Sequence, residues 1–334
     1  MPKVFVTPPM LADLPDVFQP LRDAGIEVVV NTGAYPLSGA DLSASIGDAE
    51  AVILGLDSVD ATLFETCPNL RILARNGVGM DTVDLDAATR AGVFVTVPYG
   101  ANSTSVAELT FGMMIALVRR IVSNHNRVQA GTWRREPGVE LAGKTLGIIG
   151  LGRIGKKVAR RALGFEMRVT AHDIAPDDAF ARAHGIPFVS RDALLETSDI
   201  VSLHVPLTDL THHLIDTAAL ARMPHGAFLI NAARGAVVDT RALADSLDNG
   251  HLAGAALDVH PVEGRIEPEL LDRPNVITTT HLGAYTHEAL DATARSAVES
   301  LLQFFGGEQP ENLANPDVMG VIRLPSREDR AYEQ

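Results

Sequence analysis

The sequence predicts an α/β protein built from two doubly wound units, in which helices cover both faces of parallel sheets. Short aliphatic runs alternate with amphipathic helical stretches along most of the 334 residues, a pattern typical of this class. Apolar residues make up 46 % of the chain and aromatic residues only 5 %. The cores must therefore be aliphatic, as in sheets that are buried on both faces. The length suits two domains.

The first unit is expected to hold five strands and four helices. The strand candidates are 3–7, 27–30, 51–54, 71–74 and 93–97. Helical patterns near 13–24, 38–47, 60–66 and 84–91 separate them. A long helix follows from about Asn102, and the capping-box pattern Ser105-Val-Ala-Glu108 could mark its start. Residues 109–118 are apolar nearly all round, so we expect this helix to be buried between domains or subunits.

The second unit repeats the alternation. Its strand candidates are 145–149, 167–171, 200–204, 227–230, 253–257 and 276–279. Helical patterns lie near 153–163, 176–184, 216–222 and 239–248. A last helix covers about 286–305, and the pattern alone leaves open which unit it packs on.

Charge and cysteine content narrow the function classes. The formal net charge of −14 disfavours nucleic acid and anionic membranes as partners. The single cysteine, Cys67, allows no disulfide within the chain and fits a reducing compartment. The N-terminus shows no apolar signal-peptide core, and no spaced cluster of metal ligands is recognised. We therefore expect a soluble, cytoplasmic protein without a metal.

A glycine motif predicts a dinucleotide site. Gly150, Gly152 and Gly155 form G-x-G-x-x-G between a predicted strand and a predicted helix. The first allows a tight turn, the second lets the backbone approach a pyrophosphate, and the third lets the helix pack on the strand. Asp173 follows the next strand, at the spacing of an acid that binds ribose hydroxyls. Asp173 repels a 2′-phosphate, and none of the three residues directly after it is an Arg that could bind one. NAD is therefore favoured over NADP.

Three side chains after strands of the second unit could convert a 2-hydroxy acid into its keto acid. Arg234 has a planar fork that matches a carboxylate. His281 carries an imidazole, the side chain that most often serves as a reversible acid and base. Glu263 could orient that imidazole. Taken singly, Arg234 could instead form a structural ion pair, Glu263 could be solvated, and His281 could cap a helix.

Several motifs together resemble the D-isomer-specific 2-hydroxyacid dehydrogenase family, with its phosphoglycerate dehydrogenase branch the most similar. They are Arg75-Asn-Gly-Val-Gly-Met-Asp81-Thr-Val-Asp84, Asn102-Ser-Thr-Ser-Val-Ala-Glu108, Gly150 to Asp173, Asn231-Ala-Ala-Arg-Gly-Ala-Val-Val-Asp239, Gly254-Ala-Ala-Leu-Asp258-Val and His281-Leu-Gly-Ala. The resemblance implies a Rossmann NAD-binding domain over about 101–285. It also implies a discontinuous, flavodoxin-like substrate domain, about 1–100 plus 286–334, and a homodimer built with the helix near 105–122.

The resemblance also implies roles for individual residues. Arg234 would bind and polarise the substrate, His281 would donate the proton in reduction, and Glu263 would be its partner. The implied cofactor-binding residues are Gly150, Gly152, Arg153, Ile154, Gly155, Asp173, His204, Val205, Pro206, Ala232, Ala233, Arg234, Asp258, His281 and Gly283. The implied substrate-binding residues are Asn76, Gly77, Val78, Gly79, Arg234 and His281.

Two departures argue against phosphoglycerate as substrate. Similar phosphoglycerate dehydrogenases carry a basic residue in the loop after the third strand, whereas 54–58 here has none, and Asp57 would repel a phosphate. The appended C-terminal regulatory domain of some relatives is also missing. One other function, NAD sensing, stays open, and phosphite oxidation is discounted. NAD-sensing transcriptional corepressors also resemble this family and bind peptides, and a phosphite-oxidising branch is marked by a Lys that 76–79 lacks.

Overall fold

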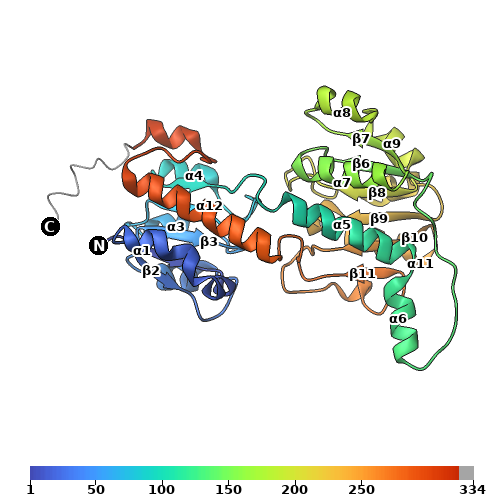
Figure 1. Ribbon diagram of the computed structural model, residues 1–334, viewed down its shortest axis with the longest axis horizontal. Coiled ribbons are helices and arrows are strands. Elements are labelled where there is room, and N and C mark those ends of the chain that lie inside the picture. The colour runs from blue at the N-terminus through green and yellow to red at the C-terminus, as the bar shows by residue number, and fades with distance from the viewer. Residues whose placement is uncertain (323–334) are drawn as a thin grey trace. The chain divides into compact units, whose positions relative to one another are not determined.

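The structure, a computed structural model, describes residues 1–322. Two compact units divide the chain (Figure 1). Unit 1 combines Met1–Asn102 with Thr286–Gln334, and unit 2 is Ser103–Tyr285. Each unit contains one parallel sheet flanked by helices, which confirms the predicted fold class.

The sheet of unit 1 has five parallel strands in the order β2-β1-β3-β4-β5. Their bounds are β1 Lys3–Val6, β2 Glu27–Val30, β3 Ala51–Leu54, β4 Ile72–Arg75 and β5 Phe94–Thr96. This is the flavodoxin-like order, in which the loops at the switch between β1 and β3 are a usual place for ligands. All five strands lie where the aliphatic runs predict them, within one or two residues.

The helices of unit 1 agree with the sequence except in the first connection. They are α1 Gln19–Asp23, α2 Gly39–Ile46, α3 Ala61–Thr66, α4 Leu85–Arg90 and α12 His287–Gly306. The expected helix near 13–24 is reduced to α1, and two 3-10 turns that each begin with a proline precede it. The last helix packs on unit 1, where Leu301 and Phe304 join the core around β1 and β3.

The sheet of unit 2 has six parallel strands in the order β11-β10-β9-β8-β6-β7. Their bounds are β6 Thr145–Ile149, β7 Arg168–His172, β8 Ile200–Leu203, β9 Ala227–Asn231, β10 Leu252–Leu257 and β11 Val276–Thr278. A single parallel bridge from Phe188 to Ala171 adds a further position beyond β7. With this bridge counted as the position of an outer strand, the strand order matches that of the doubly wound dinucleotide-binding sheet.

The helices of unit 2 are α5 Ser103–Val118, α6 Ile121–Gln129, α7 Arg153–Gly164, α8 Asp178–His184, α9 Arg191–Thr197, α10 Thr217–Arg222 and α11 Thr240–Asp248. The sequence patterns miss α9, which is only seven residues long, and merge the start of α6 with α5. Arg120 separates those two helices because its φ of 53° leaves the right-handed helical region.

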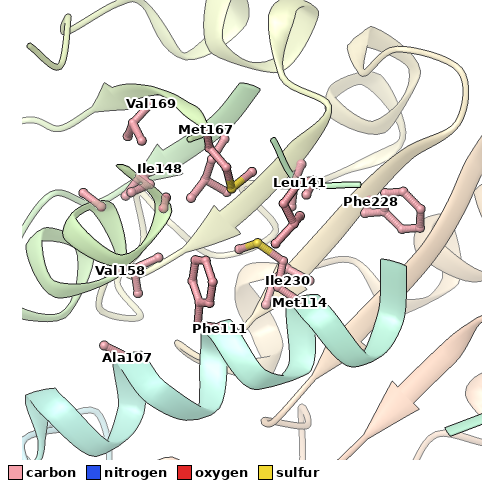
Figure 2. Packing of buried hydrophobic residues seen from close by; sticks show 14 of the residues in the cluster. Ala107, Phe111, Met114, Leu141, Ile148, Val158, Met167, Val169, Phe228 and Ile230 are labelled. Atoms are coloured by element: carbon pink, nitrogen blue, oxygen red, sulfur yellow. The ribbon is translucent and has the colours of Figure 1, made fainter. Parts of the chain in front are cut away.

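Helix α5 is buried within its own unit, which explains why its sequence is apolar nearly all round. Figure 2 shows Phe111 and Met114 rising from α5 into the cluster that also contains Val158 and Ile230. The helix begins at Ser103, so the proposed capping box at Ser105 does not mark its start. Among residues 1–322, no helix combines the length and apolar character needed to cross a membrane.

Candidate active site

The predicted functional residues of unit 2 all follow strands at one edge of its sheet. Because every strand pair is parallel, the carboxyl ends of β6 to β11 lie along a common edge. From β11 toward β7, the residues that follow the strands can be read in order. They are His281 after β11, Asp258 and Glu263 after β10, Arg234 after β9, His204 to Pro206 after β8, the glycine loop after β6 and Asp173 after β7. The dinucleotide motif therefore occupies one end of the edge, and the acid–base candidates occupy the other.

The glycine loop has the geometry of a pyrophosphate cradle. Gly150 has φ +96°, and an added Cβ would lie 2.7 Å from the carbonyl oxygen of His204. A Cβ on Gly155 would lie 2.2 Å from the Gly150 carbonyl oxygen, so α7 packs directly on the turn. A Cβ on Gly152, by contrast, would meet open space at the helix N-terminus. The residues present thus fit a dinucleotide whose phosphates lie against the first turn of α7.

Asp173 joins the end of β7 to that loop. Its carboxylate accepts hydrogen bonds from the backbone N–H groups of Leu151, at 2.7 Å, and Ala175, at 2.9 Å. These bonds fix the carboxylate beside the glycine turn. An acid held there can accept hydrogen bonds from ribose hydroxyls and repels a phosphate ester at the same place.

His204 follows β8 and packs beneath the glycine turn. Its Nε2 lies 2.9 Å from the Ser202 hydroxyl, and its buried Nδ1 has no hydrogen-bond partner. Burial lowers the pKa of His204 from 6.5 to about 4. The imidazole is therefore neutral in the folded protein at physiological pH.

This shift predicts an acid-sensitive stability. Between pH 6.5 and about 4 the unfolded chain protonates His204 while the native state does not, so stability is present above 6.5 and falls toward pH 4. The loss is at most about 3 kcal/mol. Urea unfolding of the wild type and His204→Gln at pH 7 and pH 5 measures it. The variant should lose less stability on acidification; equal losses would contradict the prediction.

The Arg234 loop is shaped by its neighbours. The Asn231 side chain, 1 % exposed, donates to the Arg234 carbonyl at 2.9 Å and accepts from the Ala233 N–H at 3.0 Å. Arg234 Nη1 donates to the Ala233 carbonyl at 2.7 Å. A Cβ on Gly235 would overlap the backbone of His260, so this loop lies directly against the segment that leads to Glu263.

His281 and Glu263 form a hydrogen-bonded pair. His281 Nδ1 lies 2.7 Å from Glu263 Oε1, and both side chains are partly exposed. A carboxylate on Nδ1 favours the tautomer with its proton there, which leaves Nε2 as the atom that exchanges a proton with a ligand. The structure thus brings together two residues that lie 18 positions apart in the chain.

In unit 1 the predicted substrate loop, 76–79, is organised by Arg75. The Arg75 side chain is 3 % exposed, and its Nε and Nη2 donate to the Gly79 carbonyl at 3.1 and 2.8 Å. Its Nη1 donates to the Gly55 carbonyl in the loop after β3. The buried guanidinium therefore ties the two loops together, a role that the sequence pattern did not reveal. Asn76 lies in the loop with a buried Oδ1 that has no partner.

Asp57 corrects one sequence-based expectation. Its side chain is fully buried and accepts hydrogen bonds from the Thr7 hydroxyl and from the N–H groups of Leu37 and Gly55. The idea that Asp57 faces and repels a substrate phosphate is wrong, because its carboxylate is used to hold the loop. The loop still contributes no basic side chain over 54–58.

Comparisons with known proteins identify the family of this chain. The family model for the D-isomer specific 2-hydroxyacid dehydrogenase, NAD binding domain, matches residues 111–283. A protein named glyoxylate reductase from Korarchaeum cryptofilum is 38 % identical over 96 % of this chain and 98 % of its own length. A D-3-phosphoglycerate dehydrogenase from Bacillus subtilis is 39 % identical over 89 % of this chain and 58 % of its own length.

A solved structure is also similar. The D-lactate dehydrogenase from Aquifex aeolicus, complexed with NAD and lactic acid, superposes with a TM-score of 0.83 and 31 % identity, covering 94 % of this chain and 99 % of that one. The sheet order, the glycine cradle and the His281–Glu263 pair lead to the same conclusion as these matches. The chain belongs to the D-isomer-specific 2-hydroxyacid dehydrogenase family and is an NAD-dependent oxidoreductase that interconverts 2-hydroxy and 2-keto acids.

Proposed function

We propose that the enzyme reduces a small, unphosphorylated 2-keto acid with His281, Glu263 and Arg234 as its catalytic groups. The observation that carries this proposal is the 2.7 Å pair of His281 Nδ1 and Glu263 Oε1, at the same sheet edge as the glycine cradle. Arg234 follows the strand next to the one that carries Glu263. The edge thus offers a cation, a proton donor and a cofactor cradle.

Each group has one task in reduction. Arg234 binds the substrate carboxylate through its planar fork and polarises the keto oxygen. His281 gives the proton on Nε2 to that oxygen, and Glu263 holds the resulting imidazole through Nδ1. NADH, when bound, supplies the hydride that the carbonyl carbon receives. Hydride and proton together convert the C=O into CH–OH, and the reverse reaction returns both.

The cofactor would lie along the carboxyl edge. We assign its pyrophosphate to the cradle of Gly150, Gly152 and Gly155, with Arg153 and Ile154 over it, and its adenosine ribose to Asp173. Its nicotinamide would lie toward β9 to β11. The remaining contacts that we propose are His204, Val205, Pro206, Ala232, Ala233, Arg234, Asp258, His281 and Gly283.

Replacing Asp173 by Ser should weaken the preference for NADH over NADPH. The variant loses the charge that repels a 2′-phosphate. We therefore expect the ratio of kcat/KM with NADH to kcat/KM with NADPH to fall by at least about tenfold. Steady-state assays with both cofactors measure it. Asp178→Ser, on the exposed start of α8, is the matched control. An unchanged ratio for Asp173→Ser would argue against ribose recognition by this carboxylate.

The substrate is proposed to lack a phosphate because 54–58 carries no cation and the Arg75 guanidinium is buried against carbonyl oxygens. Relatives named glyoxylate reductase, which match nearly the whole chain, support a small keto acid. As substrate-binding residues we propose 76–79 in unit 1 and Arg234 and His281 in unit 2.

A matched pair of substrates tests this choice. Hydroxypyruvate and 3-phosphohydroxypyruvate differ only in the phosphate, so the ratio of their kcat/KM values isolates its effect. We expect hydroxypyruvate or glyoxylate to be reduced with the higher kcat/KM. A higher value for the phosphorylated acid would overturn the choice and would require a cation from elsewhere in the protein.

We also propose that 1–100 and 286–334 form the substrate domain and that 101–285 forms the NAD-binding domain. Further, we propose a cytoplasmic homodimer. The acidic charge and single cysteine support the location, which cell fractionation tests. The dimer is supported by apolar side chains exposed on α6 and the loop after it, namely Ile121, Val122, Val128 and Trp133.

Charges placed on this apolar surface should separate the dimer. The double variant Ile121→Asp with Val128→Asp puts unpaired carboxylates where a second copy would bury apolar area. Light scattering after gel filtration should give about twice 35.6 kDa for the wild type and one chain mass for the variant. Leu210→Asp, also at an exposed apolar position, is the control. A monomeric wild type would contradict the homodimer.

A further inference from the structure

The end of β10 carries a buried carboxylate that is surrounded by the His281 loop. Asp258 is 1 % exposed. Its Oδ1 accepts from the Thr279 hydroxyl at 2.6 Å and from the Leu282 N–H at 2.7 Å, while its Oδ2 accepts from the Gly283 N–H at 2.8 Å. The Asp258 carbonyl also accepts from the His281 N–H at 2.8 Å. Three consecutive N–H groups, those of residues 281 to 283, therefore point at this one aspartate.

Such a run of N–H groups requires an unusual backbone at the first residue. His281 has φ +58°, in the left-handed region that residues other than glycine seldom adopt. Alternation of right-handed and left-handed residues turns successive N–H groups inward to form a nest for an anion. Here the N–H groups of Leu282 and Gly283 face the Asp258 carboxylate, and the His281 N–H faces the Asp258 backbone carbonyl. The strained residue of the nest is the one that carries the proposed proton donor, and strain of this kind persists only where surrounding contacts hold it.

Gly283 shows how closely the carboxylate and the loop approach. A Cβ built on Gly283 would lie 3.0 Å from Asp258 Oδ2 and 3.3 Å from Val106 Cγ2. The missing side chain thus leaves room for the carboxylate between the loop and α5. The same backbone that faces Asp258 with its N–H groups directs the His281 ring outward, where Nδ1 reaches Glu263.

We propose that Asp258 is a positioning residue that sets the His281 backbone and thereby keeps the imidazole on Glu263. This inference rests on the proposed role of His281 in proton transfer. It gives Asp258 a task separate from the cofactor contact proposed for it above. Thr279 supports the same arrangement, since its hydroxyl donates to the Asp258 carboxylate without contacting His281 itself.

The variant Asp258→Asn tests this proposal. The amide has the shape of the carboxylate, but its NH2 group replaces one accepting oxygen and then faces a backbone N–H group. A misplaced catalytic group costs about 100-fold in rate, so we expect kcat to fall by about that factor. The Kd for NADH, measured by fluorescence titration, reports the proposed cofactor contact of Asp258 separately from the rate. A thermal melt of each variant shows whether the fold is kept.

The same substitution in the His281→Ala background separates the two tasks of Asp258. If Asp258 acts through His281, Asp258→Asn lowers the residual rate no further once the imidazole is gone, and the two effects are strongly non-additive. An equal fall in kcat in both backgrounds would overturn the proposal and leave only the proposed cofactor contact of Asp258. Full activity of His281→Ala alone would instead refute the proposed function, so the two failures are distinguishable.

Thr279 provides an independent variant outside the assigned catalytic and cofactor contacts. Thr279→Val removes one hydrogen bond to the carboxylate, and we expect kcat to fall about tenfold with little change in the KM for the keto acid. Thr279→Ser should restore the rate because it keeps the hydroxyl. Thr278→Val, the same change one position earlier in β11, is the matched control. Equal rates for Thr279→Val and this control would contradict the proposal.

Discussion

Replacing His281 by alanine is expected to lower kcat about 1,000-fold, the usual contribution of a positioned general acid. NADH should still bind despite the loss of one proposed contact, because the glycine cradle and Asp173 lie at the other end of the sheet edge. The loss follows from the removal of Nε2, the ring atom left available when Nδ1 is bound to Glu263. Stopped-flow turnover together with NADH titration measures both quantities.

His225→Ala is the matched control for this variant. His225 is exposed and precedes β9, so it lies at the opposite edge of the sheet from His281. Its removal should leave kcat unchanged. Wild-type turnover in His281→Ala would remove the imidazole from the reaction and leave the His281–Glu263 contact as a structural pair.

Arg234→Lys should lower kcat/KM by about 100- to 1,000-fold, the range seen when one donor to a developing oxyanion is lost. A lysine keeps the charge but cannot reproduce the planar fork that matches a carboxylate. It also loses the bond from Nη1 to the Ala233 carbonyl, which fixes the orientation of the guanidinium. The measurement is the dependence of rate on keto acid concentration at saturating NADH.

The control for Arg234→Lys is Arg241→Lys, at an exposed arginine on α11 that pairs with Asp245 one turn along the helix. An exposed pair of this kind contributes little, so its rate should match the wild type. If Arg234→Lys also kept the wild-type kcat/KM, bidentate binding of the carboxylate by this residue would be excluded.

The strands of both units could be predicted because each is a short aliphatic run bounded by turn residues. The wrong or missing elements were those where such local signals conflict or are weak. Prolines divide the segment before β2 into short turns, and α9 lies in a segment in which no helical pattern was recognised. Helix α5 was predicted from its composition, but its sequence could not show that its apolar surface is buried within unit 2.

The site was predictable to the extent that its residues follow strands. Gly150, Asp173 and His281 carry local signals of turn, spacing and residue type. The groups that hold them do not, since Arg75 was named only as the first residue of a family motif and Asp258 only as an implied cofactor contact. Their tasks depend on contacts with residues 20 to 25 positions away in the chain. Only the folded chain brings these partners together.

Chiral analysis of the hydroxy acid formed from hydroxypyruvate and NADH tests the central claim most directly. The account predicts that the wild type consumes one NADH for each hydroxy acid formed and that the product is the D-enantiomer. Formation of the L-enantiomer would contradict the assignment of the reaction. Clear binding of NADH without consumption of any 2-keto acid would contradict the enzymatic role itself.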